Sequence, residues 1–159
     1  MKHIFIFLVL LILGPNLYSQ NKPNYPEPRE GFKRVDLVLP KIENSKDYKV
    51  QIKFSLEISV KECATADFSF NKKNLIEEYG IPMGYRFPYY VIENDAAEIS
   101  EMMQSDCKSD KKVMRKIFSI QDLFIEYQGY YARPFYIPKS WNLEYRIWKA
   151  EDKYITVDN

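Results

Sequence analysis

The stretch Tyr48-Lys-Val-Gln-Ile-Lys-Phe-Ser-Leu-Glu-Ile-Ser-Val60 places an apolar side chain at every second position. The residues between them are mostly Lys, Gln, Ser and Glu. A period of two is typical of a β-strand that buries one face and exposes the other to water. The stretch therefore predicts a long strand, which ends shortly before Cys63.

Shorter strand signals lie on both sides of this stretch. They predict strands at 32–39, 87–92, 113–120, 123–127, 135–137 and 143–151. Residues 71–79 fit either a short helical turn or an irregular loop, and residues 94–107 are expected to form a loop. Several short strands with turn signals between them predict an all-β fold, a single-domain antiparallel β-sandwich or barrel with long loops.

The N-terminus has the pattern of a secretory signal peptide. A short basic start precedes the apolar run Ile4–Leu13, a Gly-Pro pair breaks the run, and Ser19 supplies a small residue for cleavage. The run is too short to span a membrane. We therefore expect residues 1–19 to be removed on export, leaving a domain at 20–159 that begins with an extended arm at 20–31 and has no membrane anchor.

The composition excludes most catalytic devices once the signal peptide is gone. His3 is the chain's one histidine, so the mature chain cannot use Ser-His-Asp or Cys-His catalysis or offer imidazole to a metal. Two cysteines are too few for a structural zinc site, and five scattered glycines form no phosphate-binding loop. We expect no cofactor, no metal and no enzyme activity, although a carboxylate pair of the glycosidase type stays open.

The charge balance gives no sign of a nucleic-acid partner. Removal of Lys2 with the signal peptide leaves 22 basic residues against 22 acidic ones. Short lysine clusters in such a chain are typical of a solvated surface.

Residues 99–107 hold Met102-Met103 among small and acidic neighbours. Such surroundings favour a presented segment, and the alternative is an ordinary loop with two half-buried methionines. In an exported chain we expect Cys63 and Cys107 to pair, which would anchor this segment at one end. The chain-entropy model gives about 4 kcal/mol of stabilisation for the loop that a Cys63–Cys107 disulfide would close. A free thiol is the alternative.

The last strand places Trp148 on an unexpected face. Leu143, Tyr145 and Ile147 alternate with Arg146 and Trp148, so Trp148 falls on the side that should face solvent. A tryptophan there either packs under a loop or meets a partner.

Several separated motifs together resemble the ecotin family, periplasmic serine-protease inhibitors of Gram-negative bacteria. The resemblance covers Tyr25 to Lys153 and includes the strand into the first cysteine. Its motifs are Tyr25-Pro26, Gly31-Phe32-Lys33-Arg34, Gly84 before Tyr89-Tyr90-Val91, the set Ser100, Met102 and Met103, and Tyr145-Arg146-Ile147-Trp148-Lys149-Ala150-Glu151-Asp152-Lys153.

The resemblance implies inhibition of trypsin-, chymotrypsin- and elastase-like proteases through a preformed, substrate-like reactive loop. It places Met102 at P1, the residue that fills the protease's specificity pocket, and Met103 at P1′, with Met103-Gln104 as the alternative bond. An unbranched, polarizable methionine suits a broad P1. Glu101 departs from the family's threonine, and two extra residues precede the second cysteine, so the strength of inhibition stays open. The expected reactive loop comprises Ser100, Glu101 and Gln104 around the bond.

The resemblance further implies a homodimer that exchanges residues 143–153 and a periplasmic location, with secretion as the alternative. The exchanged strand would carry Tyr145, Arg146, Trp148 and Lys149. A distal protease contact would come from Tyr85, Arg86, Phe87, Tyr127, Gln128 and Tyr130, in segments that depart from the family's pattern. The rival hypothesis is an exported β-sandwich binding module with a different target.

Overall fold

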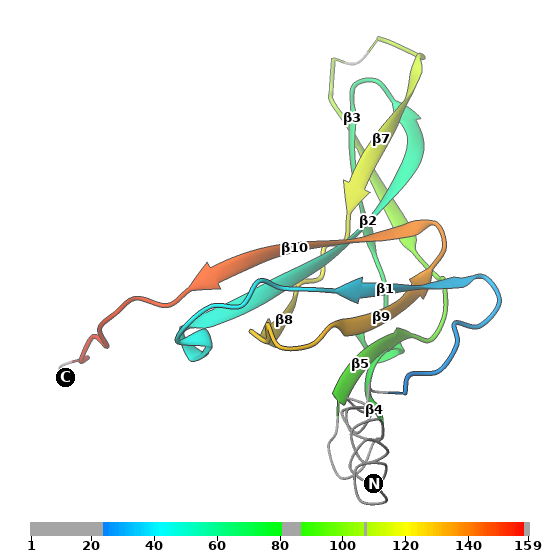
Figure 1. Ribbon diagram of the computed structural model, residues 1–159. Helices are drawn as coiled ribbons and strands as arrows, with labels where there is room; N and C mark the ends of the chain where they lie inside the picture. The colour runs from blue at the N-terminus through cyan, green and yellow to red at the C-terminus, as the bar shows by residue number, and fades with distance from the viewer. Residues whose placement is uncertain (1–23, 81–86, 107, 158–159) are drawn as a thin grey trace, which may run out of the picture.

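The computed structural model describes residues 24–80, 87–106 and 108–157, which form ten β-strands and two short 3-10 turns (Figure 1). The all-β prediction is confirmed. The strands are β1 Phe32–Leu37, β2 Tyr48–Lys61, β3 Ala64–Ser69, β4 Leu75–Gly80, β5 Phe87–Ile92, β6 Glu98–Met103, β7 Lys112–Phe118, β8 Leu123–Glu126, β9 Arg133–Pro138 and β10 Trp141–Lys149. The 3-10 turns are η1 Ser45–Asp47 and η2 Lys72–Asn74.

These strands form two larger sheets and a two-stranded ribbon. The first sheet has the order β1-β9-β5-β4, the second has the order β10-β2-β7 with β8 also on β2, and β3 pairs with β6. All strand pairs are antiparallel except β5 and β9, which pair in parallel through Tyr90 with Phe135 and Val91 with Tyr136. The long connection between β5 and β9 lets the chain return in the same direction, which a tight hairpin could not do.

β2 is the central strand of the second sheet. Its one edge pairs with β10, while β8 and β7 follow each other along the opposite edge. Ser119 fills the break between β7 and β8, because its backbone N–H donates to the Phe54 carbonyl at 2.8 Å and its Oγ accepts from the Phe54 N–H at 3.2 Å. β7 and β8 are thus two strands joined by a turn, as predicted, and both pair with β2.

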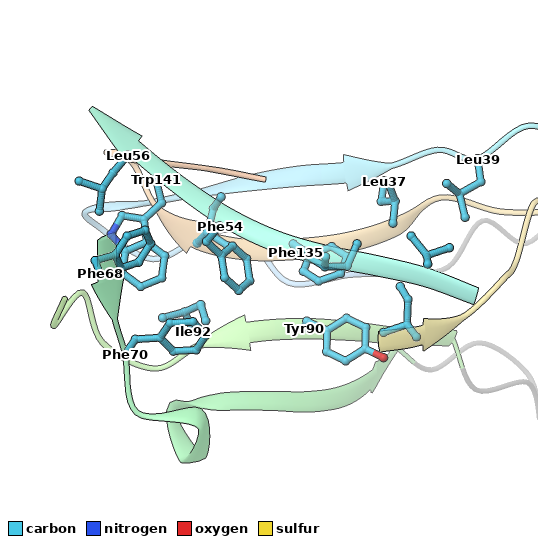
Figure 2. Packing of buried hydrophobic residues seen from close by; sticks show 14 of the residues in the cluster. Leu37, Leu39, Phe54, Leu56, Phe68, Phe70, Tyr90, Ile92, Phe135 and Trp141 are labelled. Atoms are coloured by element: carbon cyan, nitrogen blue, oxygen red, sulfur yellow. The ribbon is translucent and has the colours of Figure 1, made fainter. Parts of the chain in front are cut away.

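The core lies between the two larger sheets (Figure 2). The alternating side chains of β2 supply one wall, as the sequence predicts, and β9 and β5 supply much of the other. Trp141 packs against Phe54, Phe68 and Phe70, with ring centroids 5.0–5.7 Å apart. Tyr90 stacks on Phe135 at 4.8 Å.

The N-terminal arm has no regular structure over residues 24–29, as expected, but it packs against the first sheet. The Tyr25 ring meets the Tyr89 ring edge-on at 5.8 Å. The Tyr136 hydroxyl donates to the Pro26 carbonyl at 2.5 Å, and the Arg29 guanidinium donates to the carbonyls of Ile92 and Glu93. The arm therefore covers part of this sheet's outer face.

Two predictions about loops were wrong, the first of them only in part. Residues 71–79, expected as a helical turn or loop, do contain the helical turn η2, but they continue into most of β4, which becomes a strand through its pairing with β5. Residues 94–107, expected as a loop, contain β6. All six side chains of β6 are exposed, so this strand carries no alternating hydrophobic signal.

Candidate functional site

Met102 and Met103 lie at the end of β6, which is held in place through its pairing with β3. Met102 stands opposite Thr65 and Met103 opposite Ala64. Successive side chains of a strand point to opposite faces, so the two methionines face different ways. Met103 shares its face with the fully buried Ala64, whereas Met102 lies on the outer face.

The exposure of the two side chains follows from this arrangement. The Met102 side chain is 72% exposed and the Met103 side chain 44%. A thioether as open to water as that of Met102 has almost no packing within its own chain. The strand thus presents Met102 more fully than Met103, which is partly covered.

The remaining residues of the expected reactive loop are also presented. Ser100 stands opposite Asp67 and Glu101 opposite Ala66, and both side chains are exposed. Within the ranges that the structure describes, no ion pair engages the Glu101 carboxylate. Its charge is therefore available to a binding partner. The Gln104 N–H donates to the Cys63 carbonyl at 3.4 Å, which extends the β3–β6 ribbon by one contact.

The chain that follows Gln104 returns along the turn between β2 and β3. Glu62 holds it most closely, because its backbone N–H donates to the Lys111 carbonyl at 2.8 Å and its carboxylate accepts from Lys111 Nζ at 3.0 Å and Ser109 Oγ at 3.2 Å. Lys61 Nζ lies 3.0 Å from the Asp110 carboxylate. Figure 1 shows this turn and the start of β7 projecting together from the body of the molecule.

Of the two cysteines in the expected disulfide, Cys63 lies within the described residues. Cys63 lies in the turn between β2 and β3, beside Gln104. Cys107 lies outside the described residues, so the pairing of the two cysteines stays a prediction. The contacts of Lys61 and Glu62 bring the segment just after Cys107 to this turn.

The described members of the expected distal contact differ in exposure. Tyr85 and Arg86 lie outside the described residues. Tyr130 is exposed, and the Gln128 side chain accepts from the Tyr130 N–H at 3.0 Å. The Phe87 ring meets Tyr131 edge-on at 4.8 Å, a contact that no pattern in the sequence indicates.

Tyr127 was wrongly placed among these contact residues. Its side chain is buried, its ring lies 5.8 Å from that of Tyr48, and its hydroxyl donates to the Pro40 carbonyl at 2.7 Å. The chain here passes so close to Pro40 that a Cβ on Gly129 would lie 2.5 Å from the Pro40 oxygen. Tyr127 is therefore a core residue, because the close contact of Gly129 with Pro40 holds this segment against the body of the protein.

The C-terminal strand β10 pairs along its whole length with β2 of the same chain. Its register places Tyr145 and Ile147 on the face of the buried Ile52 and Val50, yet these two side chains are 48% and 39% exposed. The expectation of a buried face therefore fails at this end of the strand. The apolar residues Tyr154, Ile155 and Val157 in the tail beyond β10 are also exposed.

Trp148 lies on the opposite face of β10, as the sequence predicts. Its indole N–H donates to the Gln51 side chain at 2.8 Å, and Arg146 lies over its ring at 5.9 Å. Phe124 lies 6.5 Å away, so Trp148 has neighbours but stays half exposed. Lys149 forms an ion pair with Asp152 at 3.1 Å.

Within residues 24–80, 87–106 and 108–157, no cluster of three or more His, Cys, Asp or Glu side chains could hold a metal ion. The same residues contain no helix long and apolar enough to cross a membrane.

Comparison with known proteins identifies the family to which this arrangement belongs. The model of the ecotin family matches residues 21–150. An ecotin-like protein of Methylobacillus flagellatus is 24% identical over 86% of this chain and 80% of its own length. The ecotin of Pseudomonas fluorescens is 29% identical over 81% of this chain and 77% of its own length.

The family match gives the general activity. Ecotin-family proteins are periplasmic, and they inhibit serine proteases and are not enzymes themselves. The match spans both larger sheets and the exposed strand that carries Met102 and Met103. The chain belongs to the ecotin family.

Proposed function

We propose that this protein inhibits trypsin-fold serine proteases of several specificities by presenting the Met102–Met103 bond as a substrate. The observation that carries the proposal is the 72% exposure of Met102 on a strand that pairs along one edge with β3. Proteases of this fold fill a specificity pocket with one side chain, called P1, from an extended segment. A strand that is already extended and paired loses little conformational freedom when it binds.

Met102 is the better candidate for P1 because the specificity pocket must take up nearly the whole side chain. Met103 is less exposed and shares its face with the buried Ala64, so it would have to turn away from its own chain to enter the pocket. A flexible, uncharged thioether adapts to pockets of different shape, which supports broad specificity. Ser100 and Glu101 would then lie on one side of the bond and Gln104 on the other.

Inhibition rather than rapid digestion requires that both sides of the bond stay in place. Before the bond, the pairing of β6 with β3 holds the chain. After it, the contact of Gln104 with Cys63 and the contacts of Glu62 with Ser109 and Lys111 hold the returning segment. We propose that a Cys63–Cys107 disulfide adds a covalent link at the same place.

Titration of trypsin, chymotrypsin and elastase with the purified protein tests this proposal. We expect stoichiometric inhibition, and we expect Met102→Arg to strengthen trypsin inhibition at least about tenfold because the trypsin pocket contains an aspartate. Met103→Arg is the matched control and should leave the order of the three enzymes unchanged.

The alternatives give different results in this titration. A shift produced by Met103→Arg alone would assign the reactive bond to Met103–Gln104. If the protein inhibits none of the three enzymes, broad inhibition is refuted and a binding module with another target is favoured.

We further propose export and self-association. Residues 1–19 would be the signal peptide, which is consistent with a family match that begins at residue 21. The exposed Tyr145 and Ile147, with the apolar tail beyond β10, would meet a second copy of the chain in a homodimer that exchanges residues 143–153. Light scattering of the mature chain and of a chain ending at Glu144 checks this, and the same number of chains per particle in both would count against it.

A distal protease contact is proposed for the exposed part of the segment around Tyr130, together with Phe87 and Gln128. Tyr130 is exposed and aromatic, which suits an interface. Tyr85 and Arg86 stay in the proposal as predictions from the sequence.

A further inference from the structure

One guanidinium holds the turn that supports the reactive bond. Arg115 Nη1 donates to the Ala64 carbonyl at 2.5 Å, and Arg115 Nη2 donates to the Glu62 carbonyl at 3.0 Å. The carbonyl between these two belongs to Cys63, and it accepts from the Gln104 N–H. Three consecutive carbonyls thus accept hydrogen bonds, the outer two from Arg115 on β7 and the middle one from Gln104 just after β6.

Arg115 is well placed to act as a fixed point. It lies in the middle of β7, which pairs with β2 along its length, and two residues further on Ile117 is buried in the core. The planar guanidinium donates in a rigid fork, so two contacts from one side chain fix the orientation as well as the distance. A single arginine therefore ties the first residue of β3 to the core.

The position of the reactive bond depends on β3. Among the described residues β6 pairs with β3 alone, and its exposed side chains add no packing against the core. Ala64, which Arg115 holds, is the residue opposite Met103. Any shift of the Glu62–Ala64 turn would therefore move the partner of Met103 and the Cys63 carbonyl that binds Gln104.

We propose that Arg115 is a positioning residue for the reactive bond. It holds the chain segment that begins at Met103 in place, so that the peptide bond re-forms after the protease attacks it. This role rests on the proposed function. The protease serine attacks the Met102 carbonyl, forms an ester with it and releases the Met103 amine. When that amine stays in place it attacks the ester, re-forms the peptide bond and releases the serine. When the amine moves away, water attacks the ester and leaves Met102 with a carboxylate.

The sequence gives no sign of this role, because Arg115 stands in an ordinary alternating strand. Lysine is a poor substitute there, since a single ammonium cannot reproduce the planar two-donor fork. Arg115→Lys is therefore an informative variant that keeps the charge and the strand but loses the paired contact.

The test compares Arg115→Ala and Arg115→Lys with Lys116→Ala, all in the full mature chain. Lys116 is the next residue on β7, and its ammonium contacts Glu144 at 2.9 Å, so the control loses a polar contact from the same strand. Three quantities are measured: hydrogen exchange of the Gln104 amide, the rate at which chymotrypsin hydrolyses the Met102–Met103 bond, and the thermal unfolding midpoint.

We expect Arg115→Ala to raise both the Gln104 exchange rate and the hydrolysis rate by roughly ten- to a hundredfold, the size expected for the loss of charge-assisted hydrogen bonds. Arg115→Lys should recover part of each effect, and Lys116→Ala should change neither. The Ser119 amide, which donates to the Phe54 carbonyl in the core, should exchange at its original rate in every variant that remains folded.

Unchanged exchange at Gln104 in a folded Arg115→Ala protein would overturn the positioning role and leave the proposed function intact. Equal hydrolysis of Arg115→Ala and Lys116→Ala would also overturn it. A wild-type protein that inhibits no protease would instead refute the proposed function, and the exchange of Gln104 would still decide whether Arg115 holds this turn.

Discussion

The central strand β2 and the exposed strand β6 have the same backbone structure but are held in place by different forces. β2 is paired on both edges, and its alternating side chains, from Val50 to Leu56, lie in the core. β6 pairs with β3, and all of its side chains are exposed. Apolar burial stabilises the first strand, whereas backbone pairing and the polar contacts of the neighbouring turn hold the second.

Under the proposed function, this difference separates stability from function within one small domain. Side chains that are needed for packing cannot also enter a protease pocket, so the proposed reactive strand β6 has to keep its side chains free. As a result, the position of β6 depends on β3. The contacts of Arg115, Glu62 and Lys61 around the β2–β3 turn hold β3 in place.

The largest effect on stability is expected for a core residue of β2. Phe54→Ala should lower the free energy of unfolding by ~3–5 kcal/mol, because the ring is buried against Phe70 and Trp141 and its loss leaves a cavity. Urea denaturation measures the change. Ser59→Ala, at an exposed position of the same strand, is the control and should change stability little. Similar losses for both variants would contradict the account of β2.

High pH should destabilise the protein through tyrosines in its first sheet, whereas the strands of the β3–β6 ribbon contain no tyrosine and contribute none of this effect. Burial, with the nearby carboxylates of Glu78 and Glu77, raises the pKa values of Tyr89 and Tyr90 to about 12. The ordinary pKa is 10.0, so the stabilisation is complete below pH 10 and is lost as the pH rises towards 12.

Thermal unfolding between pH 9 and pH 12 checks this prediction. The melting temperature of the wild type should fall steeply over this range. A protein with Tyr89→Phe and Tyr90→Phe should show a shallower fall, because the phenols that must stay neutral in the fold are gone. The same pH dependence in both proteins would contradict the assignment.

The smallest effect on stability is expected at β6, the proposed reactive strand. Met102→Ala should change the free energy of unfolding by less than ~0.5 kcal/mol, since its side chain is largely in water. Met103→Ala should cost slightly more because that side chain is partly covered. A loss above ~1 kcal/mol for Met102→Ala, measured in urea, would mean that Met102 packs within its own chain.

The sequence predicted the parts of the fold that depend on burial. The period of two from Tyr48 to Val60 identified β2, and the β-prone run Tyr89-Tyr90-Val91-Ile92 identified β5. Both strands have side chains in the core, so their apolar residues carry the signal. The extended arm was also predictable, because its prolines exclude regular pairing.

The parts that depend on tertiary pairing could not be predicted in this way. β6 has no buried side chain, and β4 is a strand because β5 lies beside it. Burial of Tyr127 depends on the close approach of Gly129 to Pro40, which no local pattern shows. Exposure of Tyr145 and Ile147 likewise has no local signal, because the alternating pattern of β10 predicts a buried face there.

The sequence suggests which residues form the candidate site, but it does not show what holds them in place. Met102 and Met103 could be named from the sequence because two adjacent methionines among polar residues are unusual on a surface. Their alternating directions follow from the pairing of β6 with β3, and the role of Arg115 follows from hydrogen bonds across the fold. Neither feature leaves a mark in the local sequence.

The most direct test of the central claim is the position at which a target protease cuts this inhibitor. The mature protein is incubated with a catalytic amount of chymotrypsin, reduced, and weighed by mass spectrometry over time. The account predicts slow, incomplete cleavage between Met102 and Met103, by an enzyme that the same protein inhibits when present in equal amount. Rapid cleavage without inhibition, or a first cut at any other bond, would contradict it.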